Sequence, residues 1–182
     1  MKKKLLVGAI IFLVIAGLFS LTGCGKKKET DNSQKQAPQE SQTVDETLVK
    51  INNQEFNLNQ DDVFKDIKFT IVPDFKKSEF EHYVQYNYLQ DGSSNLLYFR
   101  VFYYEGQDNN TAIKDLGLDS DITLSDGKTD NIEYKIYEKP RDDGGTIHFY
   151  FINHEENTYV LHFVSKYDIK DFESKVVKSV KF

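Results

Sequence analysis

The sequence predicts an α+β domain: an antiparallel β-sheet of about seven strands, with a short middle helix and a C-terminal helix packed on it. Three observations support this. Apolar and polar side chains alternate with a period of two through much of residues 46–182, as they do in half-buried strands. All 11 Tyr and 12 of the 14 Phe lie in this part of the chain, and such aromatic content suits a packed sheet. The last residues then change to a helical period.

The first strands are predicted to be a short hairpin with Asn in its turn and a separate strand that ends at a Pro. Residues 48–51 and 55–58 are predicted to pair through a turn at Asn52-Asn53, because Asn tolerates the backbone that a tight hairpin requires. Residues 67–71 alternate apolar and polar side chains, and Pro73 ends that strand.

A long hairpin and a meander follow. Residues 80–89 and 96–104 flank the turn-forming segment 91–95, and together they predict the long hairpin. Three later strands are predicted to form an antiparallel meander, at residues 132–137, 146–152 and 158–164.

The register of the last two strands follows from their apolar positions. Odd-numbered residues are apolar in both 146–152 and 158–164, and paired strands must share a buried face. The sequence therefore predicts that His154 lies opposite Thr158, across a three-residue loop at 155–157. In this register His148, Tyr150 and His162 share the other face.

Two helices are predicted. Residues 110–116 form a short helix that ends at Gly117, a residue suited to the left-handed C-terminal position. The C-terminal helix starts at Asp168 as N-cap. Its apolar side chains then recur at helical spacing and predict one face packed on the sheet: Ile169, Phe172, Val176 and Val180.

The N-terminus carries an export signal. Lys2, Lys3 and Lys4 precede an apolar run of 17 residues from Leu5 to Leu21, which is the arrangement of a secretory signal peptide. The run is slightly short for a helix that spans a membrane, which needs about 20 residues. The next residues, Leu21-Thr22-Gly23-Cys24, resemble the lipobox of bacterial lipoproteins.

That resemblance implies a location. Residues 1–23 would be the signal peptide, and Cys24, the only cysteine in the chain, would become the N-terminus and carry a diacylglycerol. We then expect the protein on the outer face of a bacterial cytoplasmic membrane, in a Gram-positive cell by its Lys-, Asn- and Ile-rich usage. An uncleaved signal anchor is the alternative.

A tether separates the anchor from the domain. Residues 24–45 contain no aromatic side chain, so they bury too little apolar surface to fold and are predicted to be disordered. Residues 46–182 are predicted to form one α+β domain, a length that can build a single core.

The predicted domain is similar in layout to the Mog1/PsbP-like superfamily. Members often open with an apolar strand running into a Pro, as residues 69–75 do, and close with a helix and a Ser-apolar-x-Phe ending, as residues 179–182 do. The hairpin at 48–58 is not part of that layout. The resemblance implies a binding or assembly factor more than an enzyme, although a fold does not fix a function.

Charge and motifs exclude several functions. Residues 46–182 carry 16 basic and 25 acidic side chains, a net charge of −9. Such a domain is a poor partner for phosphate backbones, so nucleic acid is excluded. No phosphate-binding glycine loop, nucleophile elbow or dinucleotide fingerprint occurs. We predict no cofactor apart from the covalent diacylglycerol on Cys24.

The best metal candidate is the pair His148 and His162. In the predicted register their side chains start roughly 5–8 Å apart, close enough to share a transition metal, with Glu155 or Glu138 nearby. The alternative is two unrelated surface histidines. The acidic stretch 115–130 resembles a calcium loop only superficially, since Leu124 stands where the turn requires Gly.

The Tyr-rich hairpin 80–104 is the most distinctive candidate for recognition. Aromatic residues with Arg are enriched at binding surfaces, and the candidate ligand-binding residues are Tyr86, Tyr88, Arg100 and Tyr104. The alternative is that these side chains belong to the core. The sequence thus predicts a membrane-anchored binding or accessory module for an envelope protein or glycan. A metal-dependent or hydrolytic envelope enzyme on the His148/His162 face is the alternative.

Overall fold

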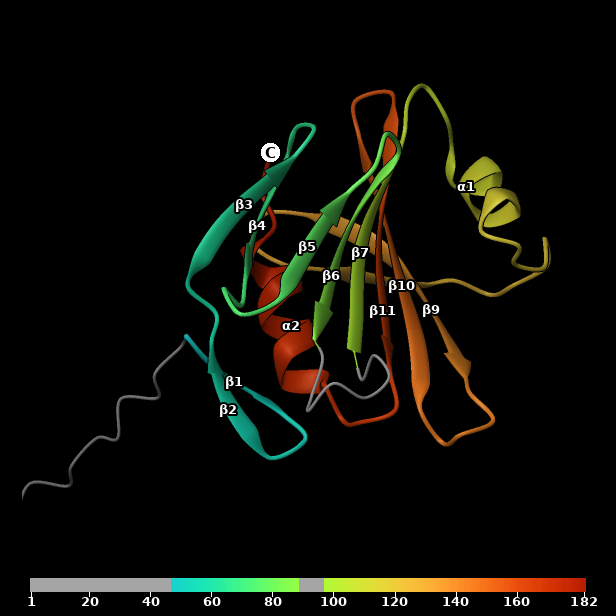
Figure 1. The fold of residues 1–182 in the computed structure, drawn as a ribbon. Coiled ribbons are helices and arrows are strands. Elements are labelled where there is room, and N and C mark those ends of the chain that lie inside the picture. The colour runs from blue at the N-terminus through green and yellow to red at the C-terminus, as the bar shows by residue number, and fades with distance from the viewer. Residues whose placement is uncertain (1–46, 89–96) are drawn as a thin grey trace, which may run out of the picture. The chain divides into compact units, whose positions relative to one another are not determined.

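A seven-stranded antiparallel sheet dominates the fold (Figure 1), in the order β5-β6-β7-β11-β10-β9-β8. The computed structural model describes residues 47–88 and 97–182, all within one compact unit. The large sheet consists of β5 (Lys76–Glu79), β6 (Tyr83–Tyr88), β7 (Leu97–Tyr104), β8 (Ser125–Lys128), β9 (Glu133–Pro140), β10 (Thr146–His154) and β11 (Asn157–Ser165).

Two small hairpins and two helices complete the fold. Their bounds are β1 (Leu48–Ile51), β2 (Gln54–Asn57), β3 (Gln60–Phe64), β4 (Ile67–Ile71), α1 (Asn109–Asp115) and α2 (Lys170–Ser179). The expected class, a mostly antiparallel sheet with one middle and one C-terminal helix, is confirmed. The signal peptide, Cys24, the tether and the 91–95 turn lie outside the described residues.

The first hairpin forms as its turn residues predict. β1 pairs with β2, and both Asn52 and Asn53 have positive φ angles, 49° and 62°, as a tight two-residue hairpin turn requires. α1 begins after Asp108, whose side chain accepts a hydrogen bond from the Thr111 amide at 3.0 Å, and Gly117 follows with φ 67°.

Three strands of the structure were not predicted from the sequence. β3, β5 and β8 read QDDVF, KKSE and SDGK, and most of their side chains are exposed. β5 and β8 form the two edges of the large sheet, where backbone pairing on one side holds a strand that has little to bury. The prediction that Asp168 caps the last helix was also wrong: Ile169 occupies the N-cap, and Asp168 accepts from the Lys170 amide at 3.1 Å.

The predicted register of β10 and β11 was wrong by one residue. His154 lies opposite Asn157, His148 opposite Phe163, and Phe149 opposite His162. The connection is a two-residue turn, with Glu155 at φ 53°. Because side chains alternate between faces along a strand, this shift places His148 and His162 on opposite faces of the sheet.

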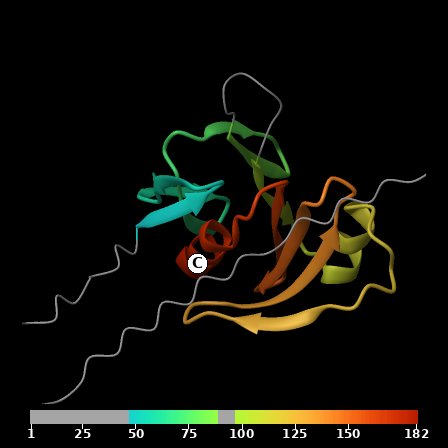
Figure 2. The ribbon, with the colours of Figure 1, turned by 90° about the horizontal axis from the view of Figure 1, so that it is seen from below.

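The inner face is defined here as the side that carries Val84, Phe99, Tyr150 and Leu161, and it holds the main core. α2 packs on it: the Phe172 ring lies 6.0 Å from Phe163 and 6.4 Å from Phe99, centre to centre. β1–β2 and β3–β4 pack on the same side and contact α2. Figure 2 shows α2 and α1 on opposite sides of the sheet.

The outer face carries Gln85, Arg100, His162 and Phe149, which lie in one row across β6, β7, β11 and β10. α1 covers one part of it, where Ala112 and Ile113 pack in a smaller apolar cluster with Phe149, Phe151 and Val160. The outer face therefore has only partial cover. Within the described residues, neither helix is long and apolar enough to cross a membrane.

Candidate functional site

Tyr86 is a core residue. It lies on the inner face, is 1% exposed, and donates its hydroxyl to Asp62 Oδ2 at 2.6 Å. Lys77 completes the group by binding Asp62 Oδ1 at 2.9 Å. Burial raises the pKa of Asp62, but the hydrogen bonds from Tyr86 and Lys77 outweigh it and hold that pKa below its usual range. Tyr86 therefore fastens β3 to the sheet and is not at a recognition surface, which corrects the sequence prediction.

Tyr88 also faces inward. Its ring packs against Phe56 and Phe75, with centres 5.0 and 5.5 Å away, and its hydroxyl donates to Gln54 Oε1 at 2.7 Å. These contacts join the β1–β2 hairpin to the large sheet. The predicted grouping of Tyr86 and Tyr88 with Arg100 and Tyr104 was thus wrong, because the two tyrosines of β6 lie on the inner face and the two residues of β7 lie on the outer face.

Tyr104 lies on the outer face beside α1. It packs against the apolar cluster of Ala112 and Ile113, and burial together with the charge of Asp115 raises its pKa to about 12. It borders a hollow of about 590 Å³ with Lys65 and His82. Tyr104 is half-buried, and it therefore helps to hold α1 against the sheet.

Arg100 lies on the outer face, outside the apolar cluster that contains α1. Its Nε donates to Gln85 Oε1 at 2.5 Å, and its guanidinium carbon lies 5.3 Å from the centre of the Tyr98 ring. Gln85 Nε2 in turn donates to Asn87 Oδ1 at 2.9 Å. Arg100 and Gln85 are half-buried and Asn87 is buried. The chain Arg100–Gln85–Asn87 is a fixed polar network, and we call it the Arg100 network.

His162 is Arg100's neighbour on β11, directly opposite it. The imidazole stacks on Phe149 with ring centres 4.4 Å apart and planes 6° apart. The side chain is buried, and neither ring nitrogen has a hydrogen-bond partner in the part of the chain that the structure describes. Burial and the charge of Arg100 lower its pKa to about 3, so His162 is neutral at physiological pH.

His148 faces inward and pairs with α2. Its Nδ1 lies 2.5 and 2.6 Å from the two carboxylate oxygens of Glu173, which is 2% exposed. Burial lowers the pKa of His148, but the hydrogen bond to Glu173 and the charges of Glu173 and Glu138 outweigh it and raise that pKa. The pair borders two hollows of about 240 and 260 Å³.

The predicted His148/His162 metal site does not form, because the sheet separates the two imidazoles. Elsewhere among the described residues, no three His, Cys, Asp or Glu side chains cluster in a way that could hold a metal ion. The stretch compared with a calcium loop contains β8, an extended strand paired with β9.

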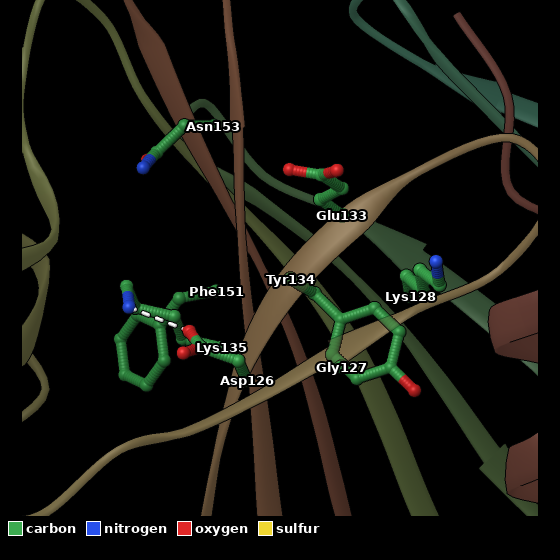
Figure 3. A pocket seen from close by; sticks show the side chains of 8 residues that line it. All are labelled: Asp126, Gly127, Lys128, Glu133, Tyr134, Lys135, Phe151 and Asn153. Carbon is green, nitrogen blue, oxygen red and sulfur yellow. Dashed lines mark hydrogen bonds and ion pairs between the residues drawn. The ribbon is translucent and has the colours of Figure 1, made fainter.

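A further hollow of about 590 Å³ lies against β8 and β9 (Figure 3). Lys135 and Asp126 form an ion pair there at 2.7 Å, drawn as the dashed line. Arg100, Tyr104, His148 and His162 do not line this hollow, so it is separate from every predicted site. Its lining consists of Asp126, Gly127, Lys128, Glu133, Tyr134, Lys135, Phe151 and Asn153.

Three polar residues of these arrangements were missed by sequence reasoning. Glu173 lies four residues after Ile169 and three before Val176, within the apolar stripe of α2, and a carboxylate in that stripe signals a buried partner. Gln85 and Asn87 alternate with Val84 and Tyr86, so they could have been placed opposite Arg100 once the hairpin register was known.

Comparison with known proteins adds no functional information. No family model and no curated protein matches the chain. A crystal structure of a protein from Bacteroides thetaiotaomicron VPI-5482 aligns with a TM-score of 0.43 and 12% sequence identity, over 63% of this chain and 44% of that one. The chain thus spans less than half the length of that neighbour, and the likeness carries no argument about fold family or function.

We predict that His148→Gln destabilises the protein by about 3–5 kcal/mol at pH 6, because it leaves the buried Glu173 carboxylate without its cation. Since the folded-state pKa of His148 is raised, the pair stabilises the fold below the unfolded pKa, about 6.5, and this stability is lost as pH rises through the folded pKa. The difference should therefore shrink at high pH.

Urea unfolding between pH 6 and 9 measures this, with the exposed His82 changed to Gln as the matched control. Equal stability losses in the two variants would contradict the prediction.

We predict that His162→Leu stabilises the protein by about 1–2 kcal/mol at pH 7, because it removes two buried ring nitrogens that lack partners. The gain should grow as pH falls. The folded-state pKa of His162 is lowered to about 3, so below about 6.5 the unfolded chain binds a proton that the folded chain does not.

Thermal unfolding at pH 7 and pH 5 tests this, and a variant less stable than the original protein at both pH values would show that the imidazole nitrogens do have partners.

Proposed function

We propose that the protein is a membrane-anchored lipoprotein, held by diacylglycerol on Cys24 at the outer face of a bacterial cytoplasmic membrane, and that it is a binding or accessory module and not an enzyme. The positive residues, the apolar run and the Leu21-Thr22-Gly23-Cys24 motif support the anchor. The resemblance to the Mog1/PsbP-like superfamily is part of this proposal, and an antiparallel sheet with a C-terminal helix packed on it agrees with it.

We place the recognition surface on the outer face around Arg100, beside the apolar cluster that contains α1, and the single observation that carries this is the Arg100 network. An arginine held by a glutamine and stacked on a tyrosine ring has lost side-chain freedom before any partner arrives, and such preorganisation lowers the entropic cost of binding.

Aromatic side chains continue this surface toward β5. Phe80, which is 49% exposed, stacks on Tyr83 at 4.5 Å, and Tyr83 packs on Phe102 at 5.2 Å. Arginine and exposed aromatic residues side by side are the composition of binding hot spots. The recognition surface is thus defined as Arg100, Gln85, Asn87, Tyr83, Phe102 and Phe80.

The enzyme alternative loses its site. It required His148 and His162 on one face, and the register of β10 and β11 places them on opposite faces.

We predict that Cys24→Ser abolishes lipid attachment and releases the protein from the membrane, because serine lacks the thiol that accepts the diacylglycerol. Cells fed an alkyne-labelled palmitate should label the original protein and leave the variant unlabelled, and the variant should leave the membrane fraction. Labelling of both proteins, or of neither, would defeat the proposed anchor.

We predict that a photoreactive phenylalanine analogue at position 80 forms cross-links in living cells, and that Arg100→Ala removes them. The same analogue at Val63 is the matched control, since Val63 and Phe80 are equally exposed, 49% each. Cross-links that persist in the Arg100→Ala background, or equal ones from position 63, would remove the proposed surface.

A further inference from the structure

The two arginines of the chain are used differently. Arg100 and Arg141 are the only arginines among 23 basic residues. Arg141 forms a two-pronged ion pair with Asp143, Nε–Oδ1 at 2.9 Å and Nη2–Oδ2 at 2.7 Å. Within residues 47–88 and 97–182, Arg100 has no carboxylate within ion-pair distance, and its one hydrogen bond runs from Nε to Gln85. Among the described residues, one arginine fork is therefore paired with a carboxylate and the other is not.

The direction of the hydrogen bonds in the Arg100 network decides what it can receive. A guanidinium only donates, so the Gln85 atom that faces Nε must be the carbonyl oxygen, and the other must be the amide nitrogen. That nitrogen donates, so the Asn87 atom it reaches must be an oxygen. The network's two side-chain acceptors are thus engaged, and donors remain: Arg100 Nη1 and Nη2, and Asn87 Nδ2, to which the described residues offer no acceptor.

The surroundings favour an anion with directional acceptors. The neutral His162 beside Arg100 adds no competing charge, and the Tyr98 ring supports the guanidinium plane. A carboxylate offers two oxygens in the spacing of the guanidinium fork. The hydrogen-bond donors that remain in the network therefore match the two oxygens of a carboxylate.

The shape of the surface indicates that the carboxylate belongs to a protein and not to a small molecule. Arg100, Gln85 and Asn87 line neither the four hollows described above nor a fifth one beside Arg141, whereas small-molecule sites are concave. The aromatic side chains of Phe80, Tyr83 and Phe102 offer apolar contacts alongside the network, as in the centre of a protein interface with its polar groups around it.

We infer that the Arg100 network receives an Asp or Glu carboxylate from a protein partner whose apolar side chains lie against Phe80 and Tyr83. This inference rests on the proposed function and names the chemistry of the partner. The carboxylate binds the Nη atoms of Arg100 through two charge-assisted hydrogen bonds, and Asn87 Nδ2 is the further donor.

The two arginines make a direct test possible. In the ¹⁵N-labelled lipidated full chain in detergent micelles, only Arg100 and Arg141 give Nε–H signals. The probes are capped glutamate, capped glutamine as its uncharged match, glucuronate, and sodium chloride. Titration with capped glutamate should shift the Arg100 Nε–H signal and the side-chain amide signals of Gln85 and Asn87 until the shifts saturate. The Nε–H signal of Arg141 should not change.

Capped glutamine should bind at least about tenfold more weakly, as expected when a charge-assisted pair worth roughly 1.4 kcal/mol or more is lost. Arg100→Lys should lose most of the response, because an ammonium lacks the planar fork, and Lys139→Gln, on the exposed end of β9, should keep it.

Four results would overturn the inference: no Arg100 response to capped glutamate, equal shifts of both arginines, the same shifts with chloride, or a response to glucuronate without one to capped glutamate, which would make the partner an acid sugar. If Arg100 ignores carboxylates while cross-linking at position 80 still depends on Arg100, the binding surface stands and only its partner chemistry is wrong.

Discussion

The two-residue turn between β10 and β11 decides which side chains face each side of the sheet. These central strands carry nine paired residues each, and the other strands of the large sheet pair outward from them, β7, β6 and β5 on one side and β9 and β8 on the other. A turn longer by one residue would move each side chain of β11 to the other face relative to β10. The separation of His148 from His162 depends on this turn, whereas the pairing of β7 with β11 places Arg100 opposite His162.

The inner face shows how the fold buries polar groups. Tyr86, Asp62 and Lys77 form one closed group, and His148 and Glu173 form another. Each group joins an element outside the sheet to the sheet, β3 in the first case and α2 in the second. Because the partners satisfy one another, removing one member is costly. These polar residues therefore stabilise the fold.

Short sequence patterns were sufficient to predict secondary structure where one residue type fixes a backbone conformation. Asn52-Asn53 placed the first hairpin, Gly117 placed the end of α1, and period-2 alternation located the strands that carry core side chains. The edge strands β5 and β8 were missed because their stability comes from pairing with β6 and β9 and leaves no apolar pattern.

The candidate site was predicted only in part, for a different reason. Arg100 and Tyr104 do face outward, but alternation within single strands could not decide that Tyr86 and Tyr88 point the other way, since that depends on how β6 pairs with β7.

The error in the β10–β11 register had a similar origin. Apolar side chains occupy both faces of these strands, Phe149 and Phe151 outside and Tyr150 and Ile152 inside, so the odd-to-odd match gave no information on the face.

The two inner groups Tyr86–Asp62–Lys77 and His148–Glu173 pair their charges within the chain, whereas the Arg100 network does not do so among the described residues, and this separates a structural role from a binding role. In each inner group the carboxylate accepts hydrogen bonds from the side chains beside it, although the buried Tyr159 hydroxyl on the same face has no partner among the described residues. The outer row contains a guanidinium without a carboxylate and an imidazole without a partner among the described residues. An unpaired buried polar group costs about 1–3 kcal/mol, so a sequence selected for stability alone would replace His162 by an apolar residue. His162 is buried and does not reach the surface, but the half-buried Arg100 does. The Arg100 network is better explained as a polar group completed from outside the chain, and its unused donors set the chemistry of what completes it.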